Sequence, residues 1–225
     1  MHAIRIAWPP MSRPRLTLIA LLSLLATAVL SLAVSRGHSA DGLEHHALRV
    51  FERARVVDHW GRLADFLATP VIGAVFLVCL VFGALRRVLL RVVAGAAFAT
   101  IAFEVNEHVV KPLVHESFRG ALSFPSGHVT AVCATALAMW IALYPVLGRS
   151  ARVITFAIGA AWTILMSVAV VGAFWHTPLD DIGSVLLSVG FVTAGAAILL
   201  PKQSTPAPPV EAEPEPEPEL VTAGV

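Results

Sequence analysis

The chain has 225 residues, of which 57% are hydrophobic and only 14% are charged, and its formal net charge is +1. A soluble domain carries roughly 25% charged residues, so this composition excludes an ordinary soluble domain and indicates an integral membrane protein. The near-neutral charge gives no basis for expecting a nucleic-acid partner. The two cysteines, Cys79 and Cys133, lie inside apolar runs and are expected as buried free thiols, not as a disulfide or a metal site.

Residues 1–15 form a short basic segment, and residues 16–34 follow it as an uncharged apolar run. A helix of about 20 residues crosses the roughly 30 Å of bilayer hydrocarbon, so this run predicts a first transmembrane helix. The alternative is a secretory signal peptide that ends at the small residues Ala33-Val34-Ser35. The run is long for the apolar part of a signal peptide, which favours a retained helix.

A mixed-charge connector, residues 35–62, comes next. Its apolar residues recur at helical spacing, which predicts an amphipathic helix on the membrane surface. These residues are Leu43, Ala47, Val50, Ala54 and Val57. The adjacent His45 and His46 could bind a metal ion, but solvated histidines on a surface helix are the simpler interpretation, and no metal site is predicted.

Five further apolar runs are each about long enough to cross a membrane. They are residues 63–85, 88–105, 128–147, 153–171 and 179–200. With the first run they predict an all-α fold, a polytopic membrane bundle of six transmembrane helices, with residues 63–200 as its five-helix core. The end of the chain, residues 201–225, contains alternating Glu and Pro, which predicts a disordered acidic Pro-rich tail.

The positions of Lys and Arg predict the orientation of the bundle, because cytoplasmic loops are enriched in these residues. With six spans both termini lie on one side, and that side would hold Arg5, Arg13, Arg15, Arg86, Arg87, Arg91, Arg149, Arg152 and Lys202. Most basic residues of the other side belong to the longer, charge-balanced connector. We therefore expect cytoplasmic termini and an exterior connector. The preference for Arg over Lys points to a GC-rich bacterial genome, and hence to a bacterial plasma (inner) membrane.

Three polar segments fall on the predicted exterior side. The first, residues 106–123, carries the cations Lys111 and Arg119. Glu107 precedes Lys111 by four residues, so the two could simply form an ion pair along a helix.

The second segment is Pro125-Ser126-Gly127-His128, at the start of an apolar run. The free N–H groups of a helix N-terminus and the helix dipole favour an anion at such a place. Ser126 can cap the helix, Gly127 allows a ligand to approach the backbone, and His128 can supply a proton near neutral pH. The alternative is an ordinary capped membrane helix with an interfacial histidine.

The third segment holds His176 and Asp180 around Pro178. Proline is well suited to the first turn of a helix, so His176 would lie just before the last span and Asp180 in its first turn. Residues four apart in a helical turn can meet. Each residue alone has an ordinary explanation, an interfacial histidine and an acid at a helix start, but both lie on the same side as the second segment.

Together the three segments supply the groups that phosphoryl transfer requires. Cations and a helix N-terminus neutralise phosphate oxygens. One histidine can attack phosphorus while the other protonates the departing oxygen, and an aspartate can orient the attacking histidine through its other ring nitrogen.

With these motifs the chain resembles the type 2 phosphatidic acid phosphatases, integral-membrane relatives of the vanadium haloperoxidases. That family has six spans and the signatures Lys-x6-Arg-Pro, Pro-Ser-Gly-His and Ser-Arg-x5-His-x3-Asp. The resemblance covers roughly residues 63–200. The second signature is intact at residues 125–128, and the third retains His176-x3-Asp180.

The resemblance implies a catalytic core and assigns a role to each site residue. His176 is the nucleophile that forms a phosphohistidine, Asp180 orients it, and His128 is the general acid. The phosphate is held by Lys111, Arg119, Ser126 and the backbone of Gly127. No cofactor and no metal ion are implied.

The chain departs from the family at two places. Seven residues separate Lys111 from Arg119, and Gly120 replaces the proline. In the third signature Ala169 and Val170 stand where the family has Ser-Arg. An arginine clamp at a phosphoryl group can contribute about 10³–10⁵ in rate. Either another cation, such as His115 or an arginine of the connector, fills this gap, or the chemistry is slow or altered.

Three functions follow as hypotheses. The favoured one is a metal-independent lipid phosphatase with its active site on the exterior face. Phosphatidic acid, phosphatidylglycerol phosphate and undecaprenyl diphosphate would all suit it as membrane substrates. The second is a relative that binds a phospholipid or polyprenyl phosphate without efficient turnover, and the third is a membrane scaffold that displays the acidic tail.

Overall fold

The structure, a computed structural model, describes residues 12–36, 49, 57–118 and 121–199. In chain order its elements are α1 (Arg13–Ser35), α3 (Val57–Leu85), α4 (Leu89–Val105), the π-helical turn η1 (Asn106–Val110), α5 (Lys111–Val114), β1 (Ser117–Phe118), β2 (Ala121–Leu122), α6 (Gly127–Leu143), the 3-10 turn η2 (Tyr144–Val146), α7 (Arg149–Gly172) and α8 (Pro178–Leu199). Arg119, most of the connector and the acidic tail lie outside the described residues.

Six helices are long and apolar enough to cross a membrane, which confirms the predicted all-α bundle of six spans. Their outer faces carry large exposed apolar side chains, such as Leu77, Leu90 and Ile164. Such faces suit lipid and not water. The protein is therefore a multi-pass membrane protein. Cys79 and Cys133 are free and buried, as the sequence predicts.

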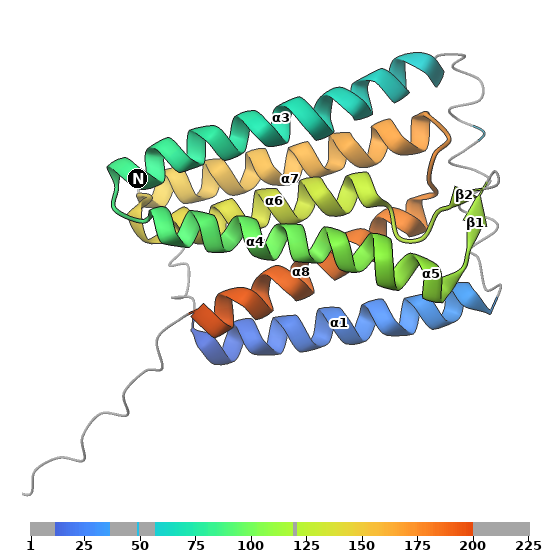
Figure 1. The fold of residues 1–225 in the computed structure, drawn as a ribbon, viewed down its shortest axis with the longest axis horizontal. Helices are drawn as coiled ribbons and strands as arrows, with labels where there is room; N and C mark the ends of the chain where they lie inside the picture. Colours follow the sequence, from blue (N-terminus) through green and yellow to red (C-terminus); the bar gives the residue numbers. More distant parts are fainter. Residues whose placement is uncertain (1–11, 37–48, 50–56, 119–120, 200–225) are drawn as a thin grey trace, which may run out of the picture.

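Helices α6 and α8 form the interior of the bundle. Half of their apolar windows is buried, against less than a quarter in each of the other four spans. Figure 1 shows α1 along α8 on one side and α3 along α7 on the other, with α4 in front of α6. Glycines allow α8 this close packing, because a Cβ at Gly190 would overlap Leu24 and one at Gly195 would overlap Phe98.

The start of α3 and the end of the helix after α4 are the boundaries that differ most from the sequence prediction. Helix α3 begins at Val57, well before residue 63. The polar segment expected after residue 105 continues instead as helix through η1 and α5 to Val114. Polar side chains are tolerated there because the end of a membrane helix reaches the interface, where its surroundings are no longer hydrocarbon.

One end of the bundle gathers the segments that carry the sequence motifs. The first residues of α3, α6 and α8 lie at this end, together with the last residues of α7, the turn α5 and the β1–β2 hairpin (Figure 1). Strands β1 and β2 pair antiparallel, with Ser117 opposite Leu122. The three motif segments are thus brought to a single end of the bundle.

Candidate active site

The first motif segment lies on the helical continuation of α4. Lys111 Nζ lies 2.7 Å from Glu107 Oε1, so the predicted pairing along a helix is confirmed. Glu107 lies in η1, a π-helical turn that adds a residue to the helix and shifts the direction of the side chains around it, and Lys111 follows as the first residue of α5. Such turns occur frequently at functional sites.

The second segment forms the start of α6. Ser126 is its N-cap, and its side-chain oxygen accepts a hydrogen bond from the Val129 N–H at 3.5 Å, as predicted. The Ser126 carbonyl also accepts from the Thr130 hydroxyl at 2.8 Å. Ser126 is fully buried, while Gly127 forms the adjacent cavity wall.

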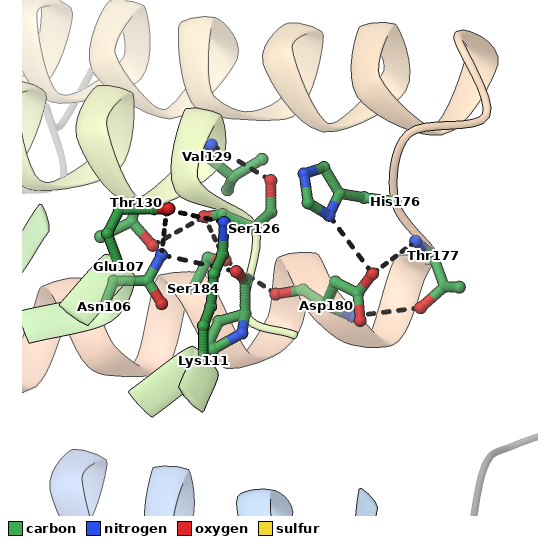
Figure 2. A network of polar contacts seen from close by, with 11 residues as sticks. Asn106, Glu107, Lys111, Ser126, Val129, Thr130, His176, Thr177, Asp180 and Ser184 are labelled. Carbon is green, nitrogen blue, oxygen red and sulfur yellow. Dashed lines mark hydrogen bonds and ion pairs between the residues drawn. The ribbon is translucent and has the colours of Figure 1, made fainter. Parts of the chain in front are cut away.

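The third segment is held by a reciprocal cap at the start of α8. Asp180 Oδ2 accepts from the Thr177 N–H at 2.8 Å, and the Asp180 N–H donates to Thr177 Oγ1 at 3.3 Å. The same carboxylate oxygen lies 3.4 Å from His176 Nδ1, so the predicted meeting of these residues is confirmed (Figure 2). The sequence signal for this cap is Thr177-x-x-Asp180, a capping pattern that was not among the predictions, together with Pro178 at the first helical position, which was.

Further polar contacts join the segments to one another. The Ser126 N–H donates to the Asp180 carbonyl at 3.3 Å. The Ser184 hydroxyl lies 2.8 Å from the Ser126 carbonyl and 2.7 Å from that of Asp180. Asn106, fully buried, directs Nδ2 toward the Pro125 carbonyl at 3.4 Å. Figure 2 shows this network between α6 and α8. Asn106, Thr177 and Ser184 were not predicted from the sequence as parts of the site.

A cavity of about 980 Å³ opens beside these residues and receives groups from all three segments. Its lining includes Glu107, Lys111, Gly127, His128 and His176. The ring of His128 lies 5.3 Å, between centroids, from that of Trp175. Asp180 is fully buried behind His176. The structure therefore brings together every predicted site residue that it describes, with Ser126 and Asp180 behind the cavity wall.

A second cavity of about 330 Å³ lies between α3 and α4, with α6 as its floor. It shares Ile72, Gly73, Phe103 and Ala131 with the larger cavity. Its remaining lining is mostly apolar and includes Phe76, with two threonines, Thr100 and Thr135. An apolar groove thus leads from the polar end toward the middle of the bundle.

The position of the missing arginine is packed inside the bundle. Val170 is fully buried in an apolar cluster with Val129, Val132 and Met166. Of the predicted substitutes, His115 is an exposed residue in left-handed conformation at the end of α5. Among the described residues that line the cavity, Lys111 is the one Lys or Arg, and no group of three or more metal-ligating side chains occurs in the described part of the chain.

The chain can now be compared with known protein families. A family model described as the PAP2 superfamily matches residues 106–204, which contain all three motif segments. This match covers less than half of the chain and supports its assignment to the PAP2 family. This confirms the resemblance to type 2 phosphatidic acid phosphatases.

A solved structure supports the PAP2 fold. It is the first transmembrane PAP2-type phosphatidylglycerolphosphate phosphatase from Bacillus subtilis, 15% identical in sequence, with a TM-score of 0.62. The likeness covers 78% of this chain and 94% of that one. At this identity it shows a shared fold. No match was found among curated proteins.

Proposed function

We propose that this PAP2 protein is a lipid phosphatase that hydrolyses a phosphomonoester or diphosphate headgroup through a phosphohistidine intermediate. The observation that carries the proposal is one cavity lined by His176, His128 and Lys111, with Asp180 buried against His176. Binding a phosphate requires a cation and N–H donors. It does not require a second histidine beside one that is oriented by a carboxylate.

The first step uses the orientation of the His176 ring. Its Nδ1 faces Asp180 Oδ2 at 3.4 Å, which favours the tautomer with the proton on Nδ1 and leaves the lone pair on Nε2. Nε2 attacks phosphorus, the bond from phosphorus to the leaving oxygen breaks, and that oxygen takes a proton from His128. The products are a phosphohistidine and the lipid alcohol, or the lipid monophosphate when the substrate is a diphosphate.

The second step returns both histidines to their starting states. Water attacks the phosphohistidine and gives a proton to His128, the P–N bond breaks, and inorganic phosphate leaves. Lys111 and the N-terminus of α6 neutralise the phosphate oxygens in both steps. Arg119, Ser126 and Gly127 complete the proposed phosphate site. All proton transfers use residues of this chain, so the mechanism needs no cofactor.

The location follows from the fold and the charge distribution. Lys and Arg favour cytoplasmic termini, so the cavity would face the exterior of a bacterial plasma membrane. A core of residues 63–200 would carry the chemistry there, and residues 201–225 would be a cytoplasmic tail. Phosphatidic acid, phosphatidylglycerol phosphate and undecaprenyl diphosphate remain candidate substrates. The Bacillus subtilis protein of the same fold is a phosphatidylglycerolphosphate phosphatase, which supports testing that lipid first.

The test is phosphate release from these three lipids by the purified protein in detergent, with and without a chelator. We expect release that is unchanged by chelator, and the preferred lipid identifies the substrate. Release that stops on chelation and returns with a divalent cation would contradict the metal-independent mechanism. Folded protein that releases no phosphate from any of them would favour the second candidate function, a protein that binds lipid phosphates without efficient turnover.

The second candidate is favoured by the presence of Val170 where the family has an arginine. The packing of Val170 predicts the effect of restoring that arginine. Val170→Arg buries a charge in an apolar cluster, so we expect no gain in kcat and a loss of stability on the order of 3 kcal/mol or more. Thermal unfolding can be followed in detergent with a thiol-reactive dye at the buried Cys79 and Cys133. Val170→Met, which stays apolar, is the control. A higher kcat with an unchanged unfolding midpoint would mean that position 170 faces the phosphate.

A further inference from the structure

The carboxylate of Glu107 lies against the first residue of α6. A Cβ added at Gly127 would overlap Glu107 Oε1, and it would lie 3.4 Å from Lys111 Nζ. The carboxylate and the ammonium group thus meet 2.7 Å apart beside the N-terminus of α6. This is the place where aligned backbone dipoles favour a negative charge.

Two features hold the Glu107 carboxylate there. Asn106, which is fully buried, directs Nδ2 toward Glu107 Oε1 and toward the Pro125 carbonyl, each at 3.4 Å. The Lys111 side chain is only 12% exposed and that of Glu107 27%, so water screens this pair less than a surface pair. Both residues nevertheless line the cavity.

The resulting charge balance is unusual for a phosphate site. Among the described residues that line the cavity, Lys111 is the one Lys or Arg, and the one carboxylate is that of its partner Glu107. A phosphate group that reaches Lys111 and the start of α6 comes into contact with this carboxylate. Two anions cannot share one ammonium group at this distance without strong repulsion.

We propose that Glu107 acts as an internal competitor for the phosphate subsite and thereby determines how tightly this site holds a phosphate group. Its carboxylate occupies the anion position beside Gly127 and Lys111 when no ligand is bound, and a phosphate has to displace it. The inference rests on the proposed function, because it takes this cavity as the phosphate site. The consequence for turnover is easier release of inorganic phosphate.

Glu107→Gln tests the competition, because the side chain keeps its size and loses its charge. We expect the dissociation constant for inorganic phosphate, measured by calorimetry on the full chain in detergent, to fall about tenfold. The inhibition constant of phosphate in the hydrolysis assay should fall by a similar factor. If Glu107 served only to position Lys111, the same substitution would weaken phosphate binding and raise both constants.

Glu104→Gln is the matched control. Glu104 precedes Glu107 by one turn and also pairs four residues ahead, with His108 at 3.1 Å, but both of these side chains are more than half exposed. The substitution removes the same charge from the same helix outside the cavity lining. We expect the phosphate constants of Glu104→Gln to remain at the wild-type value. If both substitutions changed the phosphate constants equally, the change would be explained by the loss of a negative charge anywhere on this helix, and the proposal would be overturned.

The same variants distinguish the source of the phosphate group. Phosphatidic acid in mixed micelles is the second ligand, and its KM is compared with the constant for the free ion. If Glu107→Gln binds both the free phosphate ion and the lipid more tightly, Glu107 competes with the phosphate group itself. If only the lipid binds more tightly, Glu107 competes with the lipid headgroup. The proposal is overturned if the constants for the phosphate ion and for the lipid are unchanged or higher. It is also overturned if a folded Glu107→Gln variant binds neither ligand.

The outcomes also separate this inference from the catalytic proposal. If Glu107→Gln tightens phosphate binding but no lipid phosphate is hydrolysed by any variant, the competition stands and the phosphatase function fails. If lipid phosphates are hydrolysed and neither the phosphate constants nor the KM for the lipid changes, the phosphatase function stands and Glu107 has no competing role.

Discussion

His176→Ala is expected to abolish phosphate release from every lipid phosphate that the wild-type protein hydrolyses, with kcat lower by about 10⁴-fold or more. The reason is that the proposed first bond to phosphorus is made by this residue, and no other described histidine has a carboxylate buried behind its ring. The measurement is phosphate release in detergent at saturating lipid. Loss of kcat with a retained unfolding midpoint would locate the defect in the chemistry.

His108→Ala is the control for this variant. His108 is an exposed histidine outside the cavity lining, paired with Glu104 at 3.1 Å, and its removal should leave kcat within about twofold of the wild-type value. A direct test of the intermediate is to quench the protein during turnover of labelled lipid phosphate. The label should be stable in alkali, labile in acid and absent from His176→Ala. Label retained by that variant would place the nucleophile elsewhere.

Asp180→Asn is the second substitution for which we expect a large effect, a fall in kcat of about 10²–10⁴-fold. Asp180 has two tasks, because Oδ2 accepts from the Thr177 N–H at 2.8 Å and also faces His176 Nδ1. An asparagine keeps an oxygen that can accept from Thr177, so the helix cap survives. It presents no negative charge to stabilise the protonated Nδ1 of His176 during attack.

Comparison with Thr177→Ala separates the two tasks of Asp180. Thr177→Ala removes the hydroxyl that accepts from the Asp180 N–H and should lower stability by about 1 kcal/mol while leaving the carboxylate in place. We expect Asp180→Asn to show the opposite pattern, with kcat strongly reduced and the unfolding midpoint nearly unchanged. If both variants lost activity only in proportion to their stability, Asp180 would be a cap and not a positioning residue for His176.

The parts of this molecule that could be predicted from sequence depend on local physics. A predominantly apolar run of about 20 residues identifies a span whatever surrounds it, so six spans and the fold class could be predicted directly. The pairs Glu107–Lys111 and His176–Asp180, each four residues apart, and the Ser126 cap depend on a single helical turn. The boundary after residue 105 was predicted wrongly, because polarity alone does not distinguish a loop from a helix that extends beyond the hydrocarbon.

The parts that escaped prediction depend on packing between distant segments. Ser184 joins the Ser126 carbonyl to that of Asp180, and Asn106 reaches the Pro125 carbonyl, although neither spacing is visible in the sequence. The contact of Glu107 with Gly127 requires both the π-helical turn and the position of α6. The buried side chain of Val170 likewise depends on how α7 packs against its neighbours. Arg119 lies outside the described residues, and its role stays a prediction.

The groove between α3 and α4 changes which concentration governs occupancy of the site. Its apolar walls continue the polar cavity to the depth of the acyl chains, through the shared residues Ile72, Gly73 and Phe103. A ligand whose tail remains in such a groove meets the protein by diffusing in the plane of the bilayer, so the relevant variable is its mole fraction among lipids and not its molarity. Rates measured in micelles should therefore fall when inert detergent is added at constant substrate concentration.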